Sequence, residues 1–362
     1  MKNEELRTAT ASNDEWRSLI SQETIERVRR DNSFDFLRYL FAFSLILVHF
    51  CTLTETEQFW VISGQTRVKA FFTITGFLVV YSYLRRGSLS VYVRKRFLRI
   101  VPAYVTVIIV SLIVGSIFSQ LPVQQYITDT QTYEFLGANL SFLNYLQPSL
   151  PGLFTQNYET AVNGSLWSMK FEVLFYVLVP FIVWLMRRYH KLTILAVIFL
   201  FHMIWHGILD YLEDHNPDIS LYAALNHGSF NTIIYFFSGT VLLLYFDWFC
   251  RYVKWILPLT IMLLVAWYFV DFPLLNYIEP LLFSAVIIGV AYFCRPLNFL
   301  QHHDNISYGL YLYHYPIIQV LVQYKLHQYN IYLAFIVTLL LTILMAALSW
   351  RFIEKPLLKK SA

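Results

Sequence analysis

Residues 36–53 read FLRYLFAFSLILVHFCTL, an apolar run long enough to cross a bilayer that also contains Arg38 and His49. Strongly polar side chains are costly in lipid, so they usually face a cavity or a ligand path. Eleven residues make about three helical turns, so both side chains project from nearly the same face, roughly 16 Å apart along the axis. The run therefore predicts a helix face with a cation near one membrane surface and an imidazole much deeper.

The composition of the whole chain also indicates a membrane protein. Of the 362 residues, 57% are hydrophobic and only 14% are charged, whereas a soluble chain of this length carries far more charge. The three cysteines are too few and too scattered for a disulfide framework or a zinc cluster. No GxxxxGK[ST] or GxGxxG motif is present, which argues against a nucleotide-hydrolysing or Rossmann domain. We expect a lipid bilayer, and no nucleic acid, among its partners.

Ten apolar segments are candidates for membrane spans of about 17 to 25 residues, although the second is short. They cover residues 36–53, 70–84, 100–119, 166–186, 192–209, 228–246, 254–270, 274–293, 306–325 and 331–351. The expected fold is an all-α, polytopic integral membrane helix bundle of about ten transmembrane helices. Nine or eleven spans remain possible on this evidence.

The distribution of lysine and arginine gives an independent prediction of topology. If the N-terminus is cytoplasmic, the inner segments hold 22 of the 27 basic residues and the outer segments hold only 3. The other two, Arg38 and Lys170, fall within spans. Such a bias is typical of the positive-inside rule, so both termini are predicted to be cytoplasmic.

The predicted domain plan has one large unit with short extensions. Residues 1–33 form a cytoplasmic tail or surface helix, residues 34–356 the transmembrane bundle, and residues 357–362 a cytoplasmic tail. A surface helix would place Trp16, Leu19, Ile20 and Val28 on one side. The largest outer loop is expected at about 120–165. Without a separate soluble domain, the chemistry is expected within the bundle.

A polar layer is predicted in the outer half of the membrane. Span directions and the rise of 1.5 Å per residue place Glu172 roughly 10 Å below the outer surface, at a depth similar to those of His49 and Thr75. A carboxylate that orients an imidazole is the usual way to make it a general base. The alternative for Glu172 is a salt bridge with Lys170 or another buried cation, since charges within membranes pair.

On the cytoplasmic side, the densest positive cluster reads RKRFLRIVPAY at residues 94–104. Topology signalling explains several of these charges. Arg96 and Arg99, together with Arg38, would nevertheless make a good clamp for a phosphorylated ligand that enters from the cytosol. Arg94 belongs to the same cluster.

Two further groups of histidines need consideration. His202, His206 and Asp210 have the i, i+4, i+8 spacing of metal ligands on one helix face, but a polar outer mouth explains them equally simply, and no metal is predicted. His314 lies among tyrosines in ISYGLYLYHYP, residues 306–316, about 12 Å from the cytosol by helical rise. A hydrogen-bonded core histidine is the simpler explanation for His314.

At this point the chain resembles the acyltransferase-3 family of bacterial membrane acyltransferases, which includes O-antigen and exopolysaccharide O-acetyltransferases. Six elements occur in the family's order: FDFLRYLFAFSLILVHF with the Arg-x10-His spacing, FFTITGFL, RKRFLRIVPAY, GSLWSMKFEVLFY, ISYGLYLYHYP and FIEKP. The fourth resembles SLWSLxxExxFY and aligns Glu172 with the family glutamate. Departures are Thr75, where the family usually has serine, and the basic Arg67 and Lys69 before Phe71.

The resemblance implies transfer of an acyl group, most often acetyl from cytosolic acetyl-CoA, to a carbohydrate or glycolipid hydroxyl at the outer face of the bacterial cytoplasmic (inner) membrane. Acetyl-CoA would be a substrate, and no permanent cofactor is implied. Arg38 and the basic loop would hold the coenzyme A phosphates. His49, with Glu172, would act as the base or relay the acyl group. Oxyanion or acceptor contacts would come from Thr75, Ser165, Trp167, Tyr311 and His314.

Other functions remain open on the sequence alone. A secondary transporter of a lipid-linked glycan or an anion could use Arg38, His49 and Glu172 as substrate or proton sites. Transporters often show repeated halves, and no internal repeat is visible here. The acceptor could also be a lipid or a small molecule.

Overall fold

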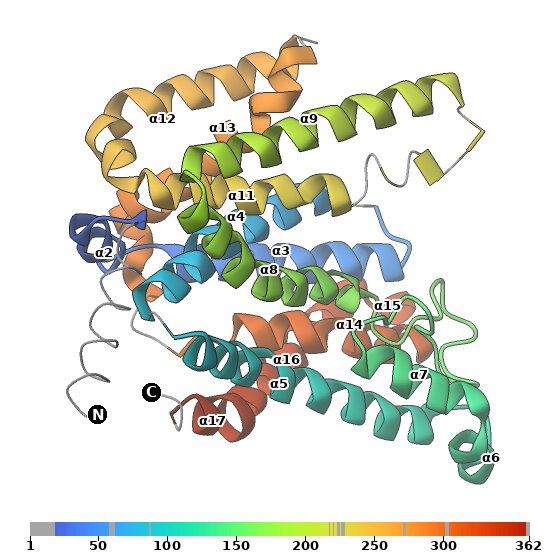
Figure 1. Ribbon diagram of the computed structural model, residues 1–362. Helices are drawn as coiled ribbons and strands as arrows, with labels where there is room; N and C mark the ends of the chain where they lie inside the picture. Colours follow the sequence, from blue (N-terminus) through green and yellow to red (C-terminus); the bar gives the residue numbers. More distant parts are fainter. Residues whose placement is uncertain are drawn as a thin grey trace. The chain divides into compact units, whose positions relative to one another are not determined.

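The computed structural model describes residues 19–57, 62–86, 88–216, 218–219, 221–222, 225, 229–270, 273–300 and 304–359 (Figure 1). These residues form helices, short helical turns and connections. The chain divides into two compact units. The first unit contains residues 1–37, 65–92 and 174–301, and the second contains residues 38–64, 93–173 and 302–362.

Most helices lie entirely, or almost entirely, within one of the two units. The first unit holds α2 (Gln22–Val28), α4 (Gly64–Arg86), α9 (Lys191–His215), α11 (Ser229–Leu244), α12 (Phe246–Phe269), α13 (Pro273–Phe293) and η3 (Arg295–Leu300), with most of α8 (Met169–Arg188). The second unit holds α6 (Val123–Thr128), α7 (Thr130–Leu140), η2 (Gly164–Ser168), α14 (Ser307–Gln323), α15 (Leu326–Tyr329), α16 (Ile331–Ser349), the π-helical turn η4 (Trp350–Glu354) and α17 (Lys355–Lys359), with most of α3 (Phe34–Leu53) and α5 (Leu89–Phe118).

Each of the ten predicted spans coincides with one helix: α3, α4, α5, α8, α9, α11, α12, α13, α14 and α16. Among the described residues, seven helical stretches are long and apolar enough to cross a membrane, and they include α3, α5, α8, α9, α12, α13 and α16. The helical, multi-pass membrane fold is therefore confirmed. The count of ten and the cytoplasmic termini stay predictions. Trp16 and residues 360–362 lie outside the described residues.

Two glycines bring α4 and α11 into backbone contact in the first unit. A Cβ atom on Gly76 would lie 1.9 Å from the carbonyl oxygen of Phe236, and one on Gly239 would lie 2.1 Å from that of Thr73. Small residues allow such close approach, which membrane helices use because the hydrophobic effect gives little force between them in lipid. The first unit is thus organised by direct contact between helix backbones.

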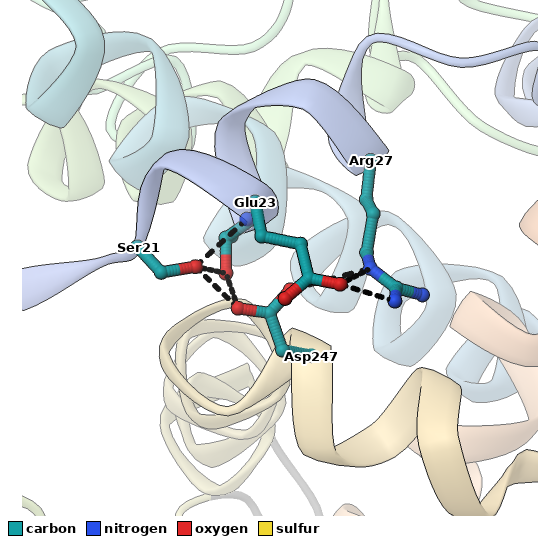
Figure 2. A network of polar contacts seen from close by, with 5 residues as sticks. Ser21, Glu23, Arg27 and Asp247 are labelled. Carbon is teal, nitrogen blue, oxygen red and sulfur yellow. Dashed lines mark hydrogen bonds and ion pairs between the residues drawn. The ribbon is translucent and has the colours of Figure 1, made fainter.

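Polar contacts attach the short helix α2 to α12 (Figure 2). The Ser21 hydroxyl accepts a hydrogen bond from the Thr24 amide at 2.9 Å and caps the helix. Thr24 donates to the Asp247 carboxylate at 2.8 Å, and Arg27 Nε lies 3.5 Å from the same group. A helix of seven residues is not stable alone in water, so these contacts account for its formation.

The second unit has a core of small residues where α14 packs against α16. Buried positions on α16 recur every four residues from Ala334 through Thr338 and Thr342 to Ala346. A Cβ atom on Gly309 of α14 would lie 2.7 Å from the Ala346 Cα. This contact fixes α14, which carries His314, firmly within the unit.

A buried glutamine attaches the outer-loop segment to α14. The Gln319 side chain is fully buried and donates to the carbonyl oxygens of Glu159 and Ala161, both at 2.7 Å. Its own oxygen accepts a hydrogen bond from Asn157 at 2.8 Å. Every hydrogen-bonding group of the amide has a partner, as burial requires. The loop from 157 to 163 is therefore held against the helix that carries His314.

Candidate active site

Two histidines from distant parts of the sequence meet in the second unit. The Nδ1 atom of His49 on α3 lies 2.7 Å from the Nε2 atom of His314 on α14. The two rings are nearly parallel, with an interplanar angle of 6° and centroids 5.0 Å apart. The Nδ1 atom of His314 lies 2.9 Å from the carbonyl oxygen of Leu310.

These contacts assign the protons on both neutral rings. A carbonyl oxygen can only accept, so His314 carries its proton on Nδ1 and donates it to Leu310. The Nε2 atom of His314 is then an acceptor, and His49 must donate to it from Nδ1. In this tautomer the other nitrogen of His49, Nε2, carries no proton, which is the form that a general base or a nucleophile needs.

The two histidine side chains differ in burial. His314 is fully buried, whereas His49 is partly exposed. Tyr315 meets the His49 ring edge-on with centroids 5.2 Å apart, and Gly164 packs so closely against Tyr315 that a Cβ atom would lie 2.7 Å from its ring. The accessible ring is thus supported from the interior by His314 and from the side by Tyr315.

The segment that ends the outer loop is attached to α14 beside this pair. Asn163 donates to the Leu312 carbonyl oxygen at 2.8 Å, and the Ser165 hydroxyl donates to the Asn163 side-chain oxygen at 2.6 Å. The Tyr311 hydroxyl donates to the Ser165 carbonyl oxygen and lies 3.1 Å from the Ser168 hydroxyl. Ser165, Tyr311 and His314 thus belong to one polar region. The Ser165 proton is directed to Asn163, so a role at an oxyanion would require that bond to exchange.

Glu172 lies close to the same region. It occupies the first turn of α8, and its carboxylate acts electrostatically on the Tyr311 hydroxyl. Tyr311 and His314 are three residues apart on α14, so they share a helix side. Lys170 forms no ion pair within the described part of the chain, so the predicted alternative of a Lys170–Glu172 salt bridge is wrong. The other half of that alternative, a pair between Glu172 and another buried cation, stays a prediction. The direct pairing of Glu172 with His49 stays a prediction.

Arg99 of the predicted phosphate clamp contacts the C-terminal end of the chain. Its Nη1 atom lies 3.5 Å from a carboxylate oxygen of Glu354, which is 1% exposed and belongs to the π-helical turn η4. The guanidinium lies over the Trp350 ring at 5.6 Å and the Tyr308 ring at 6.0 Å. π-Helical turns often occur at functional sites. Arg99 is thus held in place by the FIEKP element.

The hydrogen bonds of two tyrosines bring the elements that carry Arg38 and Arg99 to the start of α14. Tyr39, next to Arg38, donates to the Asp304 carbonyl oxygen and accepts from the Ile306 amide, both at 3.0 Å. Tyr308 donates to the carbonyl oxygen of Ile100, next to Arg99, at 3.2 Å. Arg38 and Arg99, two of the three arginines in the predicted clamp, therefore lie on segments that meet the same end of one helix.

An exposed ion pair lies at this end as well. Lys355 donates to the Asp304 carboxylate at 2.6 Å. The hydrogen bond from Lys355 holds the pKa of the Asp304 carboxyl below its usual range. Both acids described at this end, Asp304 and Glu354, therefore contact basic partners.

The other predicted site residues are less closely tied to the histidines. Arg94 is exposed and Arg96 half-buried on α5, and Trp167 packs edge-on against Phe171 with centroids 6.2 Å apart. Thr75 is half-buried on α4 in the first unit. Their roles stay predictions.

The polar group on α9 has internal contacts. His206 Nδ1 lies 2.8 Å from Asp210, and the His202 ring meets that of His206 edge-on at 6.0 Å. Within the described ranges, no group of three or more histidine, cysteine or acidic side chains could hold a metal ion.

Comparison with curated proteins finds similar chains in bacteria and a phage. Nodulation protein 10 of Rhizobium leguminosarum bv. viciae is 25% identical over 91% of this chain and 93% of its own length. The O-acetyl transferase of Shigella phage Sf6 is 22% identical over 92% and 98%. The O-acetyltransferase OatA of Staphylococcus aureus is 24% identical over 83% of this chain, which spans only 54% of OatA. No solved structure matches the chain.

A family model described as an acyltransferase domain matches residues 31–353. The match includes α3 through α16 and the first four residues of η4, and thus contains the histidine pair, Glu172 and the arginine cluster. It covers nearly all of the described helices and confirms the resemblance noted in the sequence. The chain belongs to the acyltransferase-3 family of membrane acyltransferases.

Proposed function

We propose that the protein is an O-acyltransferase that moves an acetyl group from cytosolic acetyl-CoA to a hydroxyl of a carbohydrate at the outer face of the bacterial inner membrane. The names of two relatives, both O-acetyltransferases, support the reaction class. The observation on which the mechanism rests is the hydrogen-bonded pair of His49 and His314.

In the proposed step, His49 Nε2 takes the proton of the acceptor hydroxyl while the hydroxyl oxygen attacks the thioester carbonyl carbon. The tetrahedral intermediate then collapses, its carbon–sulfur bond breaks, and the coenzyme A sulfur receives the proton from His49. The products are an O-acetyl ester and the free thiol. An activated base adjacent to the nucleophile contributes typically 10²–10⁴-fold to such reactions.

His314 assists this step through its hydrogen bond with His49. When His49 becomes an imidazolium, its Nδ1–H bond to His314 becomes charge-assisted and therefore stronger. The Leu310 carbonyl fixes the His314 tautomer, just as a carboxylate fixes the imidazole in hydrolase triads. The same Nε2 lone pair would serve if His49 carried the acyl group, and ping-pong kinetics would distinguish that route.

The donor would enter at the start of α14. Arg38 and Arg99 lie on segments joined there by the Tyr39 and Tyr308 hydrogen bonds, and guanidinium groups match phosphate oxygens well. His314 is seven residues further along α14, about 10 Å by helical rise. Phosphates bound at this end would leave the pantetheine arm to reach the histidines.

Arg99→Gln is expected to raise KM for acetyl-CoA about 10- to 150-fold with little change in kcat, since a charge-assisted hydrogen bond contributes roughly 1.5–3 kcal/mol. Steady-state kinetics with varied acetyl-CoA measure both constants. Glutamine is used because alanine would leave Glu354 buried without a hydrogen-bond donor at that position.

Glu354→Gln separates phosphate binding from a purely structural ion pair. If Arg99 binds the donor, removing the competing carboxylate should leave KM unchanged or lower it. If the Arg99–Glu354 pair only stabilises the folded protein, Arg99→Gln and Glu354→Gln should have the same effect on stability and on KM. A rise in KM in Glu354→Gln equal to that in Arg99→Gln would therefore contradict the clamp.

The function itself can be tested in sealed vesicles of both orientations. Inside-out vesicles with radiolabelled acetyl-CoA outside and glycan fractions of the host inside should accumulate alkali-labile label on carbohydrate. Right-side-out vesicles should do so only when acetyl-CoA is loaded inside. If label appears only when the donor and the acceptor are in the same compartment, transfer across the membrane is disproved. If glycan crosses the membrane without becoming labelled, the result favours a transporter.

A further inference from the structure

Lys170 is the second residue of α8 and one of two basic residues predicted within spans. It occupies one of the open positions of the SLWSLxxExxFY element. Between residues 120 and 186 it is the only lysine or arginine in the sequence.

Lys170 and Glu172 leave α8 in different directions. Two residues on a helix are about 200° apart, and Glu172 acts on Tyr311 of α14. Lys170 instead lies over the Tyr145 ring, with 4.2 Å from Nζ to the centroid, and 5.3 Å from that of Phe171. Its ammonium therefore belongs to the surface between α8 and the outer loop, next to the polar region but not within it.

The surroundings of this ammonium are aromatic. Lys170 is half-buried, and among the described residues its Nζ makes contacts with rings but no ion pair and no hydrogen bond. An ammonium has three donors and is costly to remove from water without acceptors. The ring contacts orient the cation but leave all three N–H groups available.

Other partly buried cations differ in this respect. Lys69 lies over the Tyr235 ring at 5.0 Å, yet it also pairs with the buried Glu279 at 3.2 Å. Arg99 pairs with Glu354, and Lys191 donates to the Leu19 carbonyl oxygen at 3.3 Å. Lys170 therefore resembles these cations in its partial burial and its ring contacts. It differs because no described residue accepts a hydrogen bond from its ammonium group.

We propose that Lys170 and Tyr145 form a subsite for an anionic group of the acceptor glycan, either the carboxylate of a sugar acid or a phosphate. This inference rests on the proposed function, because it assumes a carbohydrate acceptor on the predicted outer side. Tyr145 is 55% exposed, so its ring also offers apolar surface to the non-polar face of a sugar. Lys170 lies two residues after the end of η2, which places the subsite within a few residues of Ser165 and Glu172 in the sequence.

Binding to the purified full-length protein tests the subsite without any acyl transfer. The carboxylate pair of probes is trigalacturonic acid and its neutral methyl ester, and the phosphate pair is galactose 1-phosphate and galactose. The wild-type protein should bind the anion of at least one pair about 10- to 150-fold more tightly, as a charge-assisted hydrogen bond implies. The pair that shows the preference identifies the anion.

Three variants localise the effect. Lys170→Met should abolish the preference, Lys170→Arg should retain most of it, and Lys325→Met should leave it unchanged because it removes an exposed lysine at the start of α15. Equal binding of charged and neutral probes, or a preference that survives in Lys170→Met, would overturn the proposal.

A lipid headgroup is the other anion that Lys170 could meet. Thermal stability in nanodiscs of phosphatidylglycerol, compared with phosphatidylcholine, measures that interaction. A Lys170-dependent stabilisation by the anionic lipid, with no preference among the sugars, would also overturn the glycan subsite. Absence of acyl transfer in the vesicle assay, with the sugar preference intact, would instead reject the proposed function and leave the subsite standing.

Discussion

His49→Ala is expected to lower acyl transfer by about 10⁴-fold or more while the protein stays folded and still binds acetyl-CoA. The reason is that the change removes the one unprotonated nitrogen that the assigned tautomers leave on His49, its Nε2 atom. The proposed donor contacts at the start of α14 do not involve this ring. Single-turnover assays of product formation, with equilibrium binding of acetyl-CoA measured on the same preparation, check both parts.

A matched control is His206→Ala, which removes a partly buried histidine from α9 in the first unit. The variant loses one hydrogen bond, to Asp210. His206 is far in the sequence from both His49 and His314 and belongs to the other unit. We expect transfer to stay within a few-fold of the wild-type rate. Substantial transfer by a correctly folded His49→Ala protein would reject His49 as the reacting group and direct attention to His314.

Most of the helical framework could be predicted from the sequence because lipid imposes simple rules. A span needs about 20 apolar residues with all its backbone hydrogen bonds made internally, so each apolar segment coincides with one helix. Three of these helices fall short of the length and hydropathy typical of spans. α11 has 16 residues and α14 has 17, while α4 carries Arg67, Lys69 and Arg85.

The partner of His49 could not be predicted with the same certainty. Depth placed His49, Glu172 and Thr75 in one layer, and a carboxylate is the usual partner of a catalytic imidazole. Helical rise placed His314 about 12 Å from the cytosol, in the inner half of a hydrocarbon core about 30 Å thick, but placed His49 in the outer half, so their contact was not predicted. The sequence does not determine how α14 is rotated about its own axis. The close packing of Gly309 on Ala346 settles that rotation.

His314→Ala is expected to lower kcat about 10²- to 10⁴-fold, because His49 then loses the acceptor that fixes its tautomer and stabilises its imidazolium. His314→Gln should recover part of this loss, since an amide oxygen can accept the same Nδ1–H bond. Steady-state kinetics on the wild-type protein and the two variants measure these kcat values.

Glu172→Gln tests whether the carboxylate belongs to the same unit. We expect a fall in kcat of about 10²–10⁴-fold, because an amide can still orient a neighbouring group but cannot stabilise a positive charge. The double variant Glu172→Gln/His314→Gln should be little worse than the more damaging single variant, since residues that act together fail together. Full additivity of the two effects would assign Glu172 a separate role near Tyr311. A folded His314→Ala protein with wild-type kcat would show that the 2.7 Å contact has no part in the reaction.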